Sequence, residues 1–261
     1  WEVTGKGLKK SSFLFGTFHL MCKDDIHFSN QLKTAVGNAG VMYMEMDMDD
    51  PATMLGGLLL MNMKGGKKLK DLYTPDEYRK IELFFKDTIK MPLAMMQNTK
   101  PFFLEALLYP KMMPCKSFSG VEEELMKLAK QNKKEIKGLE TMEFQAAVFD
   151  SIPYEEQAKE LLKTIDSLNQ YRKYFDTMLN VYKSQQVMNM DELLSDTEFG
   201  MESHQDILLD NRNKNWVNQL KVIMKKESVF VAVGAGHLGG KNGLINLLRL
   251  QGYTVKPLLN Q

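Results

Sequence analysis

Two apolar stretches, one near each end of the chain, run directly into the pattern G-x-x-H. The first, FLFGTFH, ends at His19, and the second, VFVAVGAGH, ends at His237. Reacting groups in open α/β sheets gather beyond the carboxyl ends of the strands, and glycine lets a chain turn sharply and approach closely there. The two segments therefore predict neighbouring strands of one sheet, with His19 and His237 face to face at its carboxyl edge.

The second segment also fits G-x-G-x-x-G, the pattern of a dinucleotide-binding loop, through Gly234, Gly236 and Gly239. Such a loop opens a βαβ unit and needs an acidic residue about twenty positions later for the ribose. Here the next strand candidate carries Lys256, and the sequence ends five residues later. The pattern therefore indicates a turn that positions His237 rather than a nucleotide site.

The rest of the sequence predicts an α/β fold: a small central β-sheet with strands from both chain ends and a large helical share. Thr74 with Glu77, and Ser119 with Glu122, have the spacing of capping boxes that begin helices. The expected strands are residues 12–15, 41–46, 135–140, 229–233 and 253–258. The other expected helices are residues 153 to about 186, a shorter one from Met190, and about 203 to 226.

The composition is that of a globular protein, with 44% hydrophobic and 26% charged residues among 261. A net charge of +1 gives no electrostatic basis for nucleic-acid binding. The longest apolar run, residues 54–63, is too short to cross a membrane. We expect one domain, residues 1–261, with a helical insert at about 51–113 that either covers the site or binds a partner, and we expect most of the 20 methionines to fill the core.

A pair of imidazoles needs a carboxylate to hold a hard divalent ion. Glu45 is the first candidate, because an acid among the apolar residues of a strand is costly unless it is paired or coordinated. Glu140, which closes another expected strand, is the second, and a helix N-terminal acid is its alternative interpretation. His27 and His204 have no comparable setting and are expected to be structural or exposed.

With these features the sequence resembles the TraB/PrgY/GumN family, which includes the Tiki proteins and is related to the EreA/ChaN-like group. The motifs that carry the resemblance span the chain in the family's order. They are FLFGTFHL, the acid Glu45, GLETMEFQ at residues 138–145, DNRNKNW at 210–216 and VFVAVGAGHLGGKNGLINLLRLQGYTV at 229–255. The resemblance implies the EreA/ChaN-like fold.

Tiki members are metal-dependent proteases, and the resemblance implies a divalent metal ion, with manganese or cobalt favoured and zinc an alternative. Its expected ligands are His19, His237 and Glu45. The expected catalytic residues are Glu45, Glu140, Arg212, Asn213 and Gln145. The sequence has Asp210 and Asn211 where many members carry Glu directly before Arg-Asn. Arg212 has a plainer alternative, an ion pair with Asp206 or Asp210 on its own helix.

Many bacterial members of this family are exported or lipid-anchored. The resemblance therefore implies a periplasmic or outer-membrane lipoprotein whose signal peptide is absent from this sequence, which begins at Trp1. Cys22 and Cys115 are the only cysteines, too few for a disulfide framework or a cysteine zinc site. Composition leaves a disulfide and two buried thiols equally open, and an exported protein would favour the disulfide.

The most concrete hypothesis is a metallopeptidase that acts on a peptide or protein substrate. In it, the glutamate that is not a ligand acts as the base and Arg212 stabilises the oxyanion. A second hypothesis is a protein that binds and sequesters peptides, such as pheromones, without turnover. A third is a metal-independent, esterase-like hydrolase in which a histidine is the general base.

Overall fold

The computed structural model describes residues 1–50, 57, 60–190, 193 and 204–260. The chain divides into two compact units. The sheet unit comprises Trp1–Pro51, Cys115–Thr141 and Thr177–Gln261, and the helical unit comprises Ala52–Pro114 and Met142–Asp176. The helical unit thus includes residues 52–113 of the expected insert and adds a second segment from later in the chain.

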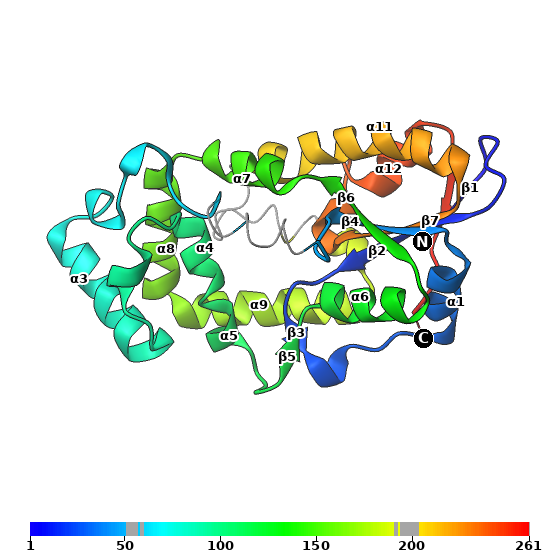
Figure 1. The fold of residues 1–261 in the computed structure, drawn as a ribbon. Helices are drawn as coiled ribbons and strands as arrows, with labels where there is room; N and C mark the ends of the chain where they lie inside the picture. The colour runs from blue at the N-terminus through cyan, green and yellow to red at the C-terminus, as the bar shows by residue number, and fades with distance from the viewer. Residues whose placement is uncertain (51–56, 58–59, 191–192, 194–203, 261) are drawn as a thin grey trace. The chain divides into compact units, whose positions relative to one another are not determined.

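The sheet unit is built on a mixed sheet with strands from both ends of the chain (Figure 1). Its described strands are β1 (Glu2–Thr4), β2 (Ser12–Thr17), β4 (Val41–Met46), β6 (Glu135–Glu140), β7 (Val229–Gly234) and β8 (Thr254–Lys256). Their order is β6-β4-β7-β2-β1-β8. The strands β6, β4, β7 and β2 run parallel to one another, while β1 runs antiparallel to both β2 and β8. The predicted α/β fold with a small central sheet is confirmed.

The two chain ends meet in the centre of this sheet, as the paired G-x-x-H segments predict. Phe13 of β2 lies opposite Phe230 of β7, and Thr17 lies opposite Gly234, so the two strands end together. The strand β7 is buried over its apolar length, since helices cover both faces of a parallel sheet. The expected strands at 41–46 and 135–140 agree with the structure at both ends.

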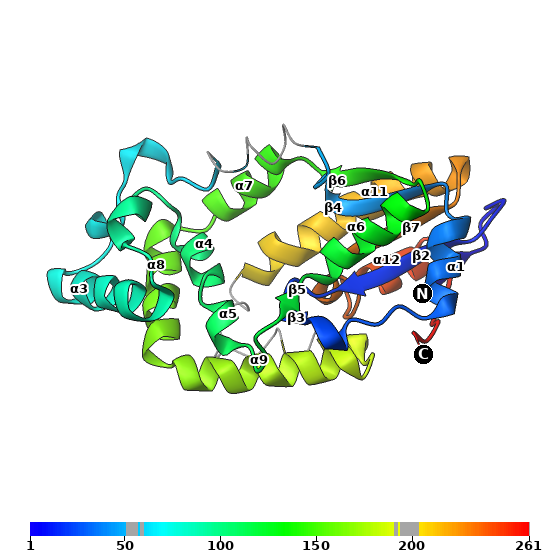
Figure 2. The same ribbon diagram turned by 60° about the horizontal axis from the view of Figure 1, so that its bottom comes forward.

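Helices cover both faces of the sheet (Figures 1 and 2). One face packs against α11 (Asn211–Lys226) and α12 (Leu244–Leu250). The core on that side contains Leu14, Val231, Trp216, Leu220 and Leu248, all buried. The other face lies under α1 (Asn30–Asn38) and α6 (Val121–Gln131), which contact each other. Successive side chains of a strand point to opposite faces of the sheet, so each strand contributes to the packing on both sides.

A small second sheet joins β3 (Met21–Cys22) to β5 (Phe118–Ser119), two strands that the sequence pattern did not predict. Beside it, Cys22 and Cys115 form a disulfide with their Cα atoms 5.9 Å apart. The bridge closes a loop with a sequence separation of 93 residues. It therefore holds the entry to α6 next to the segment that follows β2.

The helical unit is built from short helices. They are α3 (Pro75–Phe84), α4 (Pro101–Ala106), α5 (Tyr109–Met112), α7 (Met142–Asp150), α8 (Tyr154–Asp166) and the start of α9 (Leu168–Lys183). Single turns are η2 (Lys64–Gly66), η3 (Leu69–Asp71), η5 (Leu93–Met96) and a π-helical turn, η4 (Phe85–Ile89). The capping box of Thr74 and Glu77 is confirmed at the start of α3. None of the helices in the described residues is long and apolar enough to cross a membrane.

Three expectations about helices need comment. The expected helix from residue 153 to 186 is broken at Ser167, where α8 ends and α9 begins. The short helix expected from Met190 lies almost entirely outside the described residues. The capping box expected at Ser119 is wrong, because Ser119 belongs to β5, the residue before α6 is Gly120, and Glu122 turns toward another partner.

Short turns complete the sheet unit: η1 (Lys23–Asp25), η6 (Val187–Asn189), η10 (Ala235–His237) and the π-helical turn η9 (Asp206–Asp210), which leads into α11. Short 3-10 turns often connect elements, and π-helical turns are frequent at functional sites. Two of them, η9 and η10, flank the residues described next.

Candidate functional site

The carboxyl edge of the four parallel strands gathers the acids and histidines singled out in the sequence. Glu45 is the fifth residue of β4 and Glu140 is the last of β6. His237 ends the turn η10 after β7, and His19 follows β2 by two residues. Parallel strands end on the same side of a sheet, so residues far apart in sequence meet there.

Arg212 lies at the centre of this group and joins its two acids. Its Nε donates to both carboxylate oxygens of Glu140, each at 3.1 Å, and its NH2 donates to Glu140 Oε2 at 2.8 Å. The same NH2 donates to Glu45 Oε2 at 2.7 Å. The plainer alternative is an ion pair of Arg212 with Asp206 or Asp210. The geometry does not favour it, since both acids that Arg212 contacts come from strands of the sheet.

The two acids differ in exposure. The Glu140 side chain is 1% exposed and faces Arg212 with both oxygens, whereas the Glu45 side chain is 16% exposed. Glu45 Oε1 accepts the Gly234 backbone N–H at 2.8 Å and lies 3.7 Å from His237 Nε2. Glu140 thus fixes the guanidinium, and Glu45 is the acid in contact with the histidine turn.

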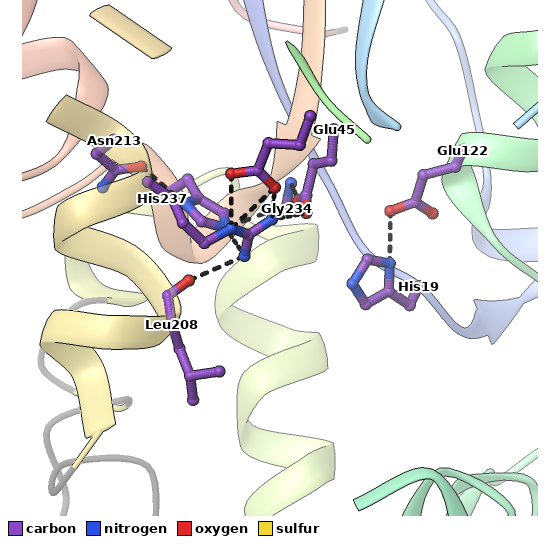
Figure 3. A network of polar contacts seen from close by, with 9 residues as sticks. His19, Glu45, Glu122, Leu208, Asn213, Gly234 and His237 are labelled. Atoms are coloured by element: carbon purple, nitrogen blue, oxygen red, sulfur yellow. Dashed lines mark hydrogen bonds and ion pairs between the residues drawn. The ribbon is translucent and has the colours of Figure 1, made fainter. Parts of the chain in front are cut away.

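His237 is held in one tautomer by a chain of hydrogen bonds (Figure 3). Asn213 Nδ2 donates to the Asn242 carbonyl at 2.9 Å, which leaves Asn213 Oδ1 toward His237 Nδ1 at 2.7 Å. Because that oxygen only accepts, Nδ1 carries the proton and Nε2 carries the lone pair. Arg212 NH1 lies 3.3 Å from that Nε2.

The charges of the cluster follow from burial and from Arg212. Burial lowers the pKa of the His237 imidazole to about 3 against the opposing pull of Glu45, so the ring is neutral near pH 7. Burial alone would raise the pKa of Glu45, but attraction to His237 and Arg212 and the Gly234 hydrogen bond lower it to about 2. The site thus presents an ionised carboxylate beside a neutral imidazole.

His19 has a partner that the sequence did not point to. Its Nδ1 lies 2.7 Å from Glu122 Oε1, at the start of α6 (Figure 3). The hydrogen bond with Glu122 raises the pKa of the His19 imidazole to about 9, although its side chain is 80% exposed. The same contact lowers the pKa of Glu122 against the effect of burial. The expected capping acid is therefore the residue that orients His19.

Gly16 and Gly234, the glycines of the two G-x-x-H turns, let neighbouring segments pack closely against the backbone. A Cβ atom at Gly16 would lie 3.1 Å from Ala235 Cα and 3.0 Å from Leu238 Cδ1, so only glycine lets β2 pack this tightly on the η10 turn. A Cβ atom at Gly234 would lie 3.2 Å from Glu45 Oε1. Neither residue has a positive φ. Glycine is therefore needed at both positions for close packing, as predicted, and not for an unusual backbone conformation.

Trp216 forms the wall behind these groups. It is fully buried in α11, with its ring 4.4 Å from the His237 ring and its face 4.8 Å from the Arg212 guanidinium carbon. Residues 212, 213 and 216 share one face of a helix at i, i+1 and i+4, which is why DNRNKNW contributes three side chains to one place. Asp210, the departure from the family pattern, accepts a hydrogen bond from Asn242 Nδ2 at 2.6 Å.

The kinds of side chain in this site suit a divalent ion, but the distances between them do not. A metal-binding histidine usually has its second ring nitrogen held by a carboxylate or carbonyl oxygen, and both His19 and His237 are held in this way at Nδ1. Yet, across the described residues, no three His, Cys, Asp or Glu side chains are close enough together to hold an ion. The Arg212 guanidinium lies against His237 Nε2 and Glu45 instead.

Of the remaining predicted residues, Asn213 lies in the site, while Gln145 lies in α7 of the helical unit and stays a prediction. His27 is exposed, as expected, and follows η1. Sequence reasoning missed Glu122 and Asn242. For Glu122 a signal was present, since three successive acids, residues 122–124, exceed what one helix start requires.

Comparison with known proteins identifies the family of this chain. Residues 1–257 match the model of the TraB/PrgY/gumN family. The chain is 23% identical over 255 residues to a Shigella flexneri protein described as uncharacterized protein YbaP, covering 95% of this chain and 91% of that protein. No solved structure gives a significant match. The sequence from β2 to the histidine turn after β7 is thus matched as a whole, and the chain belongs to the TraB/PrgY/gumN family.

Proposed function

We propose that this protein is a metal-dependent hydrolase that cleaves peptide bonds. The observation that carries the proposal is the matching contact that His19 and His237 each make through Nδ1. Each has Nδ1 against an oxygen acceptor at 2.7 Å, so Nε2 is the nitrogen that would bind a metal ion, and at His237 the Arg212 guanidinium would have to move aside for it. Glu45, ionised and 3.7 Å from His237 Nε2, supplies a hard oxygen donor beside His237.

His19, His237 and Glu45 would hold the ion, with manganese or cobalt preferred and zinc an alternative. The bound ion would supply Lewis-acid activation of the scissile carbonyl and of the attacking water. The cluster of Glu45, Glu140 and Arg212 carries a net charge of −1 when both acids are ionised, which favours a cation. His19 must give up its second ring proton to bind, so metal affinity should rise with pH up to about 9.

The residues of the chain itself have distinct roles in this proposal. Arg212 is always cationic and lies beside Glu45, where it can stabilise the negative charge that develops on a carbonyl oxygen. Glu140 keeps Arg212 in place and does not itself meet the substrate. Asn213 fixes the tautomer of His237, and Glu122 fixes the orientation of His19.

The disulfide between Cys22 and Cys115 supports an oxidising compartment, in keeping with an exported protein. A periplasmic or lipid-anchored location is part of the proposal. Labelling of free thiols in protein taken from its native source tests it, because a cytosolic protein would have two reactive cysteines.

Metal binding can be measured without turnover. Loss of the electron paramagnetic resonance signal of free Mn²⁺ gives the affinity of purified, chelator-treated protein. We expect His19→Ala, His237→Ala and Glu45→Gln each to weaken binding by at least about tenfold. His27→Ala, which removes an exposed histidine, is the matched control and should leave the affinity unchanged.

A peptide library assayed with and without Mn²⁺ completes the test. Cleavage that requires Mn²⁺ and is lost in the three variants supports the proposal. Equal Mn²⁺ affinity in the wild type and all three variants would show that these residues do not bind the metal ion.

A metal-free hydrolase is the second candidate, because Arg212 already occupies the place of a cation, 3.3 Å from His237 Nε2 and 2.7 Å from Glu45 Oε2. In that case chelator-treated protein cleaves its substrate and His19→Ala abolishes the activity. Peptide binding without cleavage under any condition would instead favour the sequestering protein.

A further inference from the structure

We propose that the sheet unit contains a separate binding site for the acyl chain of a fatty acid. The face of the sheet opposite Trp216 lines a cavity of about 350 Å³ that opens to solvent. This volume lies within the range of small-molecule sites, about 300–1,000 Å³.

The interior of the cavity is apolar. Its floor is the outer face of β2 and β7, with the rings of Phe13, Phe15 and Phe230, and Phe28 stands edge-on to Phe15 at 6.4 Å. Leu32 and Ala35 of α1 form the opposite wall. Phe13 and Phe15 are only partly buried, although they project from central strands of the sheet. An apolar ligand would remove these rings from water.

The mouth of the cavity is polar, but its groups already pair with one another. The segment Pro257–Asn260 lies over it, and Asn260 ties that segment down on two sides. Asn260 Nδ2 donates to the His27 carbonyl at 2.7 Å, and its Oδ1 accepts the Ser29 N–H at 2.7 Å. Its backbone N–H donates to Gln185 Oε1 at 2.8 Å. Recognition inside the cavity therefore rests on apolar contact.

One ion pair at the mouth is suited to an acid head group. Lys183 Nζ lies 2.9 Å from Asp25 Oδ2, and the two side chains are 43% and 36% exposed. Exposed pairs of this kind contribute little, so a ligand carboxylate can replace Asp25 at Lys183 at small cost. An aliphatic chain in the apolar interior with its carboxylate at Lys183 satisfies both parts of the site.

The test is displacement of the fluorescent fatty acid cis-parinaric acid by dodecanoate, with both kept below their micelle concentrations. We expect saturable binding and full displacement by dodecanoate. Ala35→Phe fills the cavity from α1 and should weaken binding by at least about tenfold. Thr34→Phe places the same side chain on the neighbouring exposed position and should bind like the wild type.

Ile26→Trp is a second variant that blocks the cavity. Because Ile26 lines the cavity but is only half buried, this substitution should disturb folding less than Ala35→Phe does. Lys183→Gln should weaken dodecanoate and leave dodecanol unchanged. Equal binding by wild type, Ala35→Phe and Ile26→Trp would overturn the proposal. So would displacement of the probe by naphthol but not by dodecanoate. None of these measurements uses metal or turnover, so the outcome is independent of the proposed hydrolase activity.

Discussion

Glu122→Gln should remove the unusual basicity of His19. The hydrogen bond with Glu122 holds the pKa of His19 at about 9, compared with an ordinary value of 6.5. Glutamine keeps the size of the side chain but not its charge. We therefore expect the pKa of His19 to fall to about 6.5, since partial desolvation and the opposing charges of Glu45 and Arg212 are what remain. At pH 7.5 the protonated fraction of His19 would drop from about 97% to about 9%.

Proton NMR of chelator-treated protein measures this directly, because the chain has only four histidines. The His19 resonance is identified by its loss in His19→Ala. Glu123→Gln is the matched control, since the neighbouring acid pairs with Lys127 instead. The reasoning is refuted if His19 of the wild type titrates near 6.5, or if Glu123→Gln shifts it as much as Glu122→Gln does.

The same pair makes a pH-dependent contribution to stability. Because the folded pKa of His19 is raised, the stabilisation is complete below pH 6.5 and is lost as the pH rises through about 9. The full shift would correspond to about 3 kcal/mol. His19 is 80% exposed, so solvent screening should reduce the difference between wild type and Glu122→Gln to about 1 kcal/mol or less. Urea unfolding at pH 6 and pH 10 should show the difference shrinking at the higher pH.

Three further predictions concern the site and its frame. Glu140→Gln should lower the free energy of unfolding by about 1.5–3 kcal/mol, because it removes the charge from the hydrogen bonds that Arg212, 8% exposed, makes with Glu140, while Glu45 still pairs with Arg212; urea unfolding measures this, and a loss below about 0.5 kcal/mol would contradict it. Asn213→Ala should weaken Mn²⁺ binding by about 10- to 100-fold by freeing the His237 tautomer, and an unchanged affinity would show that the orientation of the ring does not matter. Replacing Cys22 and Cys115 together by serine should destabilise the fold by about 4–5 kcal/mol on a chain-entropy basis for a separation of 93 residues; thermal unfolding of the wild type, with and without reductant, and of the variant measures this, and a loss below about 1 kcal/mol would contradict it.

The sequence by itself determined five of the six described strands of the main sheet and the edge at which the candidate residues gather. A short, nearly continuous apolar run located β4 to the residue, because a strand that is covered on both faces is apolar along its length. The repeated G-x-x-H pattern brought His19 and His237 to one edge, and the resemblance to the family added Arg212 and Asn213. Each of these predictions depends on a signal confined to a few consecutive residues.

The tertiary structure alone decided which partner each of these side chains has. Glu122 looks in sequence like a helix-capping acid, yet it pairs with His19, 103 positions away, because β3 and β5 bring the start of α6 beside the β2 turn. Glu140 could not be distinguished from Glu45 until Arg212 was seen to take both oxygens of the more buried acid. Such pairings depend on distances between elements, and these are set by packing of the whole unit rather than by neighbouring residues.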